Sequence, residues 1–280
     1  MNKKTCIIIS GPTAVGKTSY GIELALKYNT QIISADSRQC FKELNIGVAK
    51  PSLEQLQKVK HYFINTHSIN EEVNVKIFEE YALKTVNEIF ENNDVAVMVG
   101  GTGMYIKAFA EGIDNIPEVD ESIRKEINEQ YKTHGLSWLH DEIKSHDPDF
   151  FFKGEIQNPQ RMLRALEVKL STGESIVDFH SGEKIKRDFE IKNILLELPR
   201  DQLYHNINIR VDQMMQDGLL NEARGLFPFR HLNALQTVGY KELFDYFDGK
   251  ISLEKAIDEI KKNTRHYAKR QMTWFRRYGS

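Results

Sequence analysis

The 280-residue sequence is poor in cysteine and has no long hydrophobic run. Its two cysteines, Cys6 and Cys40, exclude a disulfide framework and a zinc site built from cysteine pairs. The apolar stretch near the start ends at Gly11-Pro12, which makes it too short for a secretory signal or a membrane span. We therefore expect a cytoplasmic protein that has no membrane partner.

The chain also lacks an excess of positive charge. Its formal net charge of −2 at pH 7 argues weakly against a nucleic-acid partner. The charges are uneven, however, because residues 261–280 contain no acidic residue and carry Lys261, Lys262, Arg265, Lys269, Arg270, Arg276 and Arg277. That end of the chain is suited to an anionic partner.

One motif stands out near the start of the chain. The segment GPTAVGKT matches the phosphate-binding pattern GxxxxGK[ST] at Gly11, Pro12, Thr13, Ala14, Val15, Gly16, Lys17 and Thr18. Backbone N–H groups of such a loop cradle phosphate, the lysine adds a positive charge, and the threonine hydroxyl can ligate Mg²⁺. The motif predicts binding of a di- or triphosphate together with Mg²⁺, and it leaves open whether the phosphate is transferred.

The pattern of apolar runs predicts an α/β fold. Short buried strands are expected at residues 5–10, 31–34, 94–99 and 191–198, with helices between them and a last helix from Ser252 to about Arg277. The stretch from Asn115 to Phe189, between the third and fourth of these strands, contains no clear strand pattern. We predict a P-loop NTPase-like parallel sheet core formed by residues 1–115 and 190–280, with an inserted all-helical domain at 116–189.

Acidic residues are missing where P-loop kinases place their metal-binding aspartate, at the end of a later strand. Here the strand at 94–99 continues into Gly100-Gly101-Thr102-Gly103, whose glycines allow close approach of a ligand. The alternative is a tight turn. Asp36 follows the strand at 31–34, where α/β sheets bind ligands, and would suit a base, although a lone Asp after a strand more often forms a turn or caps a helix.

Three arginines have a similarly open interpretation. Arg210 falls at the edge of an apolar helical stripe, so we expect it to face an anion unless it forms an ion pair or extends to solvent. Arg161 and Arg164 share one face of a helix that begins at Asn158-Pro159. They could bind phosphates of a nucleic acid or form an ordinary solvated face.

Six segments in this order complete the picture: GPTAVGKT, ISADSRQ, VGGTGMY, NPQRMLRALEV, TVGYKEL and RHYAKRQMTWFRR. With them the chain resembles the tRNA dimethylallyltransferase family over nearly its whole length. The resemblance implies transfer of a dimethylallyl group from dimethylallyl diphosphate to N6 of the adenosine immediately 3′ of the anticodon, in tRNAs that read UNN codons. Diphosphate is released and i6A is formed, with the P-loop gripping the diphosphate.

The resemblance also implies the roles of single residues. Asp36 would accept the proton of N6, and Thr102 and Arg210 would complete the catalytic set. The inserted domain would contact the tRNA anticodon stem-loop. Contact with tRNA is implied for Asp36, Ser37, Arg38, Gln39, Thr102, Arg124, Gln160, Arg161, Met162, Leu163, Arg164, Gly239, Tyr240, Lys241 and Arg265. A histidine pair common in the family is His61-Tyr62 here, and we assign it no function.

Three other functions remain in competition. A related enzyme could prenylate free adenine nucleotides, a small-molecule P-loop kinase would transfer the γ-phosphate of ATP, and a non-enzymatic module would only bind tRNA. The inserted helices argue against the first, and the P-loop with Asp36 argues against the last. We expect the protein to act as a monomer.

Overall fold

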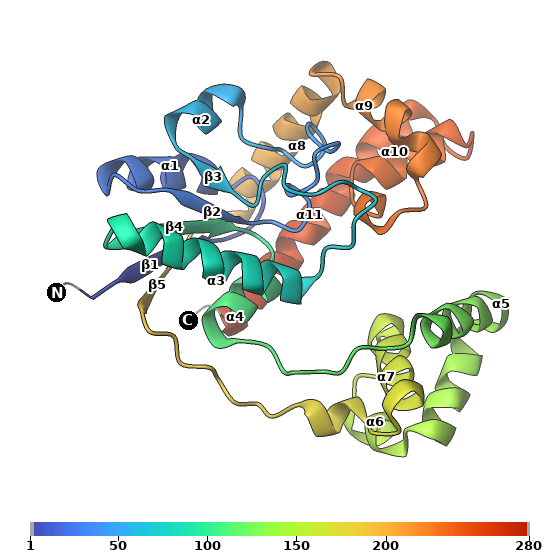
Figure 1. Ribbon diagram of the computed structural model, residues 1–280. Helices are drawn as coiled ribbons and strands as arrows, with labels where there is room; N and C mark the ends of the chain where they lie inside the picture. The colour runs from blue at the N-terminus through green and yellow to red at the C-terminus, as the bar shows by residue number, and fades with distance from the viewer. Residues whose placement is uncertain (1–2, 279–280) are drawn as a thin grey trace. The chain divides into compact units, whose positions relative to one another are not determined.

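The computed structural model describes residues 3–278 (Figure 1). The chain forms two compact units. Unit 1 extends to Gly112 and resumes at Ile185, and unit 2 comprises Ile113–Lys184. These limits lie a few residues from the domain boundaries predicted at 115/116 and 189/190.

Unit 1 is built on a five-stranded sheet of order β3-β2-β4-β1-β5, in which all neighbouring strands are parallel. The strands are β1 (Thr5–Ser10), β2 (Ile32–Ala35), β3 (His61–Tyr62), β4 (Val95–Gly100) and β5 (Glu190–Leu195). β1 is buried along its whole length because β4 and β5 flank it and helices cover it. The predicted α/β fold with a parallel sheet is confirmed. The two-residue β3 was not predicted.

Helices surround this sheet and extend beyond it in unit 1. They are α1 (Lys17–Lys27), α2 (Leu53–Lys58), α3 (Val75–Asn92), α4 (Gly103–Glu111), α8 (Arg200–Gln216), α9 (Leu219–Leu226), α10 (Tyr240–Phe247) and α11 (Leu253–Tyr278). In α3, a stripe formed by Phe78, Ala82, Thr85 and Ile89 is buried. The last helix begins near Ser252 as predicted, and Ser252 caps it, since Lys255 N donates to Ser252 Oγ at 3.2 Å. Long α11, red in Figure 1, packs against α4, α8 and α10.

Unit 2 is helical, with α5 (Glu121–His146), α6 (Pro148–Lys153) and α7 (Pro159–Thr172) around a core of its own. Helix α5 is kinked at Gly135, whose φ of 73° is non-helical. Helix α7 begins as predicted, because Asn158 Oδ1 accepts from Gln160 N at 3.1 Å and Pro159 occupies the first turn. Within residues 3–278, no helix is both long and apolar enough to span a membrane.

The parallel sheet brings three loops to one edge. The P-loop follows β1, Asp36 follows β2, and Gly101-Thr102 follows β4. Because parallel strands end at the same edge of a sheet, these loops are neighbours in space even though they are far apart in sequence. This edge is where the candidate site lies.

Candidate active site

The P-loop has the conformation that its glycines allow. Gly11 and Gly16 have φ values of 146° and 99°, in the region that residues with a side chain rarely adopt. A Cβ at Gly11 would also lie 2.5 Å from the carbonyl oxygen of Leu196. Lys17 lies back over the loop, where its Nζ donates to the carbonyl oxygens of Gly11 (3.0 Å) and Pro12 (2.7 Å). The backbone of the P-loop thus holds the ammonium group of Lys17 through two hydrogen bonds.

The charged form of Lys17 is disfavoured in this arrangement. Loss of hydration around its ammonium lowers its pKa to about 8, nearby Asp36 raises the pKa, and nearby Arg210 lowers it. Two cations that share a poorly hydrated site repel each other. An anion bound between them would favour the charged form of Lys17.

Arg210 reaches this site from α8. Its Nη1 donates to Thr13 Oγ1 at 3.3 Å, and burial lowers the pKa of its guanidinium. Among residues 3–278, no carboxylate forms an ion pair with Arg210, so the structural ion pair that the sequence left open is absent. The expectation that Arg210 faces an anion therefore remains.

Asp36 and Thr102 join the loops after β2 and β4. Oδ1 of Asp36 accepts from the backbone N–H groups of Arg38 (2.9 Å) and Gln39 (3.3 Å), so this oxygen does form the turn that the sequence left as an alternative. Ser37 N donates to Thr102 Oγ1 at 3.0 Å, and Thr102 N donates to Ala35 O at 3.2 Å. The carboxylate is fixed by backbone groups through one oxygen.

These loops enclose a cavity of about 360 Å³, within the usual size range of small-molecule sites. Many predicted residues line it: Thr13, Ala14, Gly16, Lys17, Thr18, Asp36, Ser37, Arg38, Gln39, Arg210 and Gly239. Thr102 adjoins it through Ser37. The predicted diphosphate site and the predicted base therefore open into one cavity.

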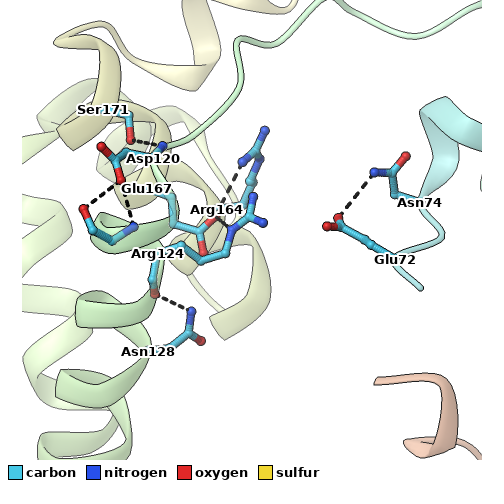
Figure 2. Close-up of polar contacts among 9 residues, drawn as sticks. Glu72, Asn74, Asp120, Arg124, Asn128, Arg164, Glu167 and Ser171 are labelled. Atoms are coloured by element: carbon cyan, nitrogen blue, oxygen red, sulfur yellow. Dashed lines mark hydrogen bonds and ion pairs between the residues drawn. The ribbon is translucent and has the colours of Figure 1, made fainter. Parts of the chain in front are cut away.

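Two of the three arginines predicted in unit 2, Arg124 and Arg164, lie around one glutamate, as Figure 2 shows. Nε of Arg124 lies 3.4 Å and Nη1 of Arg164 lies 3.5 Å from Oε2 of Glu167, whose side chain is 9% exposed. Asn128 donates to the carbonyl oxygen of Arg124 at 2.8 Å. Arg161 is more exposed and pairs with Glu155. Together, Arg124, Arg161 and Arg164 form what we call the arginine cluster.

Three predicted tRNA contacts need correction. The side chains of Met162 and Leu163 lie in the core of unit 2 at 0% and 3% exposure, so they cannot contact tRNA from the folded state. Tyr240 is fully buried and donates its hydroxyl to Glu222 at 2.6 Å, so its side chain packs inside unit 1 and is not exposed for the predicted contact. One face of such a helix packs against the core, so a sequence motif on the helix includes core residues as well as residues that can contact a ligand.

The remaining predicted positions are placed as follows. Gln160 and Lys241 are exposed, and Gly239 lines the cavity with a φ of 101°. Nη1 of Arg265 donates to Oδ1 of Asn208 at 2.8 Å, which ties α11 to α8.

His61 and Gln271 are among the polar residues of the cavity wall to which sequence reasoning assigned no role. His61 Nδ1 lies 2.8 Å from Val59 O, so this nitrogen is the donor, and burial lowers the pKa of the imidazole. Gln271 is 7% exposed. The only signal for it was an uncharged polar residue amid the cations of the segment KRQMTWFRR, which periodicity alone does not single out.

Comparisons with known proteins agree on one family. The model of the IPP transferase family matches residues 39–278. The chain is 48% identical to a tRNA dimethylallyltransferase of Christiangramia forsetii over 271 residues, covering 97% of this chain and 90% of that protein. It is 46% identical to the enzyme of that name from Flavobacterium johnsoniae, with coverage of 98% and 91%.

Solved structures give the same result for the fold. The full-length tRNA isopentenylpyrophosphate transferase of Bacillus halodurans superposes with a TM-score of 0.69 at 37% identity, covering 98% of this chain and 87% of that one. A eukaryotic dimethylallyltransferase described as acting on tRNA gives a TM-score of 0.79 at 28% identity, covering 97% and 70%.

Proposed function

The chain belongs to the tRNA dimethylallyltransferase family, and from this premise we propose that it transfers a dimethylallyl group from dimethylallyl diphosphate to tRNA. The acceptor is N6 of the adenosine immediately 3′ of the anticodon in tRNAs that read UNN codons. The observation that carries the proposal is a single cavity. The P-loop with Lys17, the guanidinium of Arg210 from α8 and the carboxylate of Asp36 all line it.

The diphosphate is the leaving group in this reaction. When the allylic C–O bond breaks, negative charge develops on the diphosphate, and donors already aimed at it stabilise that charge without reorganisation. Those donors are Lys17, Arg210 and the backbone N–H groups of the P-loop other than Pro12, which has none, and Thr13, whose N–H is donated to Gln271. Because Arg210 has no carboxylate partner within the described chain, its charge is available to the ligand.

Asp36 acts on the acceptor. The lone pair of adenine N6 is delocalised into the ring, so N6 is a weak nucleophile that gains from a base taking its proton as the C–N bond forms. The proton passes from N6 to the Asp36 carboxylate. Oδ2 has no hydrogen bond from residues 3–278, whereas Oδ1 is occupied by two N–H groups, so Oδ2 is the accepting atom.

Mg²⁺ fits this site only in part. Thr18 lines the cavity and offers one oxygen ligand, but the described residues contain no cluster of three or more His, Cys, Asp or Glu that could hold a metal. Most ligands of a bound Mg²⁺ would come from diphosphate oxygens and water, which is common for this ion. When bound, it would neutralise charge on the leaving group.

The tRNA is bound by positive charge outside the cavity. An adenine beside the anticodon is stacked and must be extruded to reach an enclosed electrophile. The arginine cluster and the cations of α11 contact phosphates, which positions the stem-loop without reading its sequence. Arg38 and Gln39, in the cavity wall beside Asp36, contact the extruded base.

A single chain in the cytoplasm performs the reaction. All the residues that line the cavity belong to unit 1. The cytoplasm is where the proposed acceptor, unmodified tRNA, is found.

The test follows the labelled donor. The protein is incubated with Mg²⁺, labelled dimethylallyl diphosphate and either unmodified tRNA or AMP, and a parallel reaction contains labelled ATP. We expect label on tRNA alone. Label on AMP alone would indicate a nucleotide prenyltransferase, and transfer of the γ-phosphate would indicate a kinase. Either result would overturn the proposal.

A further inference from the structure

One side chain of α11 connects two of the three cavity loops. Oε1 of Gln271 accepts from Thr13 N of the P-loop at 2.9 Å, and Nε2 donates to Gly101 O after β4 at 2.9 Å. The amide is buried, so both hydrogen bonds form away from water, where leaving either group unpaired is costly. The two loops are thus linked by one rigid amide.

Each end of this amide leads to a different part of the site. On the P-loop side, the residue whose N–H it holds is Thr13, whose Oγ1 accepts from Arg210 at 3.3 Å. On the other side, Gly101 precedes Thr102, whose Oγ1 accepts from Ser37 N next to Asp36. Gln271 therefore stands between the groups assigned to the leaving diphosphate and those assigned to the base.

The hydrogen bond between Gln271 and Gly101 requires that residue 101 has no side chain. A Cβ at Gly101 would lie 2.3 Å from Nε2 of Gln271, closer than any real contact. The glycine and the glutamine thus fit as a pair. On the next turn of α11, Trp274 packs in the same way on Gly103, where a Cβ would lie 2.4 Å from the indole ring.

We propose that Gln271 is a positioning residue that sets the spacing between the diphosphate-binding loop and the loop that carries Thr102. It touches neither substrate in this role. Its amide fixes how far the departing diphosphate lies from the base that serves the acceptor, and transfer is sensitive to that distance because both partners must be aligned as the C–N bond forms. The inference rests on the proposed function.

The first test replaces the amide by a side chain of similar length. Gln271→Met removes both hydrogen bonds, and we expect kcat to fall by roughly 10- to 100-fold, the usual effect of a misplacement near 1 Å. The affinity for inorganic diphosphate should fall about fivefold as Thr13 N loses its partner. The matched control is Gln202→Met on the exposed face of α8, which should change neither value.

The second test is a double-mutant cycle of kcat for Gly101→Ala and Gln271→Ala. Gly101→Ala alone should lower kcat because the new methyl group displaces the amide. In the Gln271→Ala background the same change should have a several-fold smaller effect, since the clash is gone. This cycle also provides the answer if Gln271→Met does not fold.

The possible failures can be told apart. Wild-type kcat for Gln271→Met, or independent effects of the two alanine changes, would reject the positioning role. So would a loss explained entirely by a lower unfolding temperature. If the wild-type protein transfers no label to tRNA, the proposed function fails, and diphosphate affinity of the same variants then decides whether Gln271 orders the P-loop.

Discussion

The cavity of unit 1 and the arginine cluster of unit 2, the two regions proposed to bind phosphate, are built in opposite ways. In the cavity, Asp36 and Lys17 are each held by backbone groups, at 2.9 Å to Arg38 N and 2.7 Å to Pro12 O. In the cluster, Arg124 and Arg164 lie 3.4 and 3.5 Å from Glu167, and all three arginines are partly or largely exposed. The first region is fixed and the second is adaptable.

This difference matches the two tasks. Stabilising a developing charge requires groups that are already oriented and poorly hydrated, because they then act without reorganisation. Gripping a nucleic-acid backbone requires cations that can change partner, and the exposed Arg161–Glu155 pair is weak enough to exchange its carboxylate for a phosphate. A change in the cavity should therefore alter turnover, whereas a change in the arginine cluster should alter tRNA affinity.

The largest effect should come from Asp36→Asn. The amide oxygen can still accept from Arg38 N and Gln39 N, so the turn is kept, but the base is lost. We expect turnover to fall by roughly 10²–10⁴ with donor affinity maintained. Single-turnover transfer of labelled dimethylallyl to tRNA measures this.

The matched control is Asp149→Asn in unit 2. Asp149 forms an exposed ion pair with Lys153, so its change should leave turnover and stability nearly as they were. Full turnover in Asp36→Asn would remove the carboxylate from the mechanism and leave the cavity only a binding role.

A second change separates packing from recognition within α7. Met162 is fully buried, and Met162→Ala should lower the free energy of unfolding of unit 2 by about 2–5 kcal/mol. Its exposed neighbour Arg161 should cost less than about 1 kcal/mol when changed to alanine. Denaturant unfolding of both variants tests this, and equal small effects would mean that Met162 is not a core residue.

Met162 also shows where sequence reasoning reached its limit. The strand at Thr5–Ser10, the P-loop and the Asn158 cap were predictable because each depends on neighbouring residues. A matched motif, by contrast, gave Met162 and Tyr240 the same role as the arginines beside them. Only the packing of distant helices shows that these two side chains point inward.

Gln271 was unpredictable for a related physical reason. Its partners, Thr13 and Gly101, lie 258 and 170 positions away in the chain, and no periodic pattern encodes such hydrogen bonds. His61 enters the cavity wall through β3, a strand of two residues that is too short to leave an apolar signal. Thus the loops of the site could be predicted, whereas the side chains that fasten them could not.

The third prediction concerns pH and the cavity. Lys17 has a pKa of about 8 in the free protein, below its ordinary value, so above pH 8 it is neutral until an anion binds. Binding then requires proton uptake, and affinity for dimethylallyl diphosphate should fall about tenfold from pH 7 to pH 9. Calorimetric titration in buffers of different ionisation enthalpy measures both affinity and proton uptake.

The control for this effect is Lys17→Arg, which stays charged throughout the range. Its affinity should be weaker but nearly independent of pH, and any residual slope reports ionisation of the ligand itself. The same pKa shift has an opposite effect on the free protein. Because the unfolded chain holds the proton up to a higher pH, stability without ligand should rise between about pH 8 and 10.5. A pH-independent wild-type affinity would mean that Lys17 is not at the diphosphate.

The smallest effect, and the one that most directly tests the adaptable region, concerns salt. If Arg161 and Arg164 each contact one phosphate, changing both to alanine should reduce the slope of log affinity against log salt by about one to two. Turnover at saturating tRNA should stay close to wild type, because the cavity is untouched. Lys153→Ala is the control, since it removes an exposed ion-paired cation from the same unit. If that variant flattens the slope as much as the arginine pair does, unit 2 attracts tRNA by its total charge rather than through the arginine cluster. A loss of turnover without a change in slope would instead contradict the assignment of turnover to the cavity and of tRNA affinity to the arginine cluster.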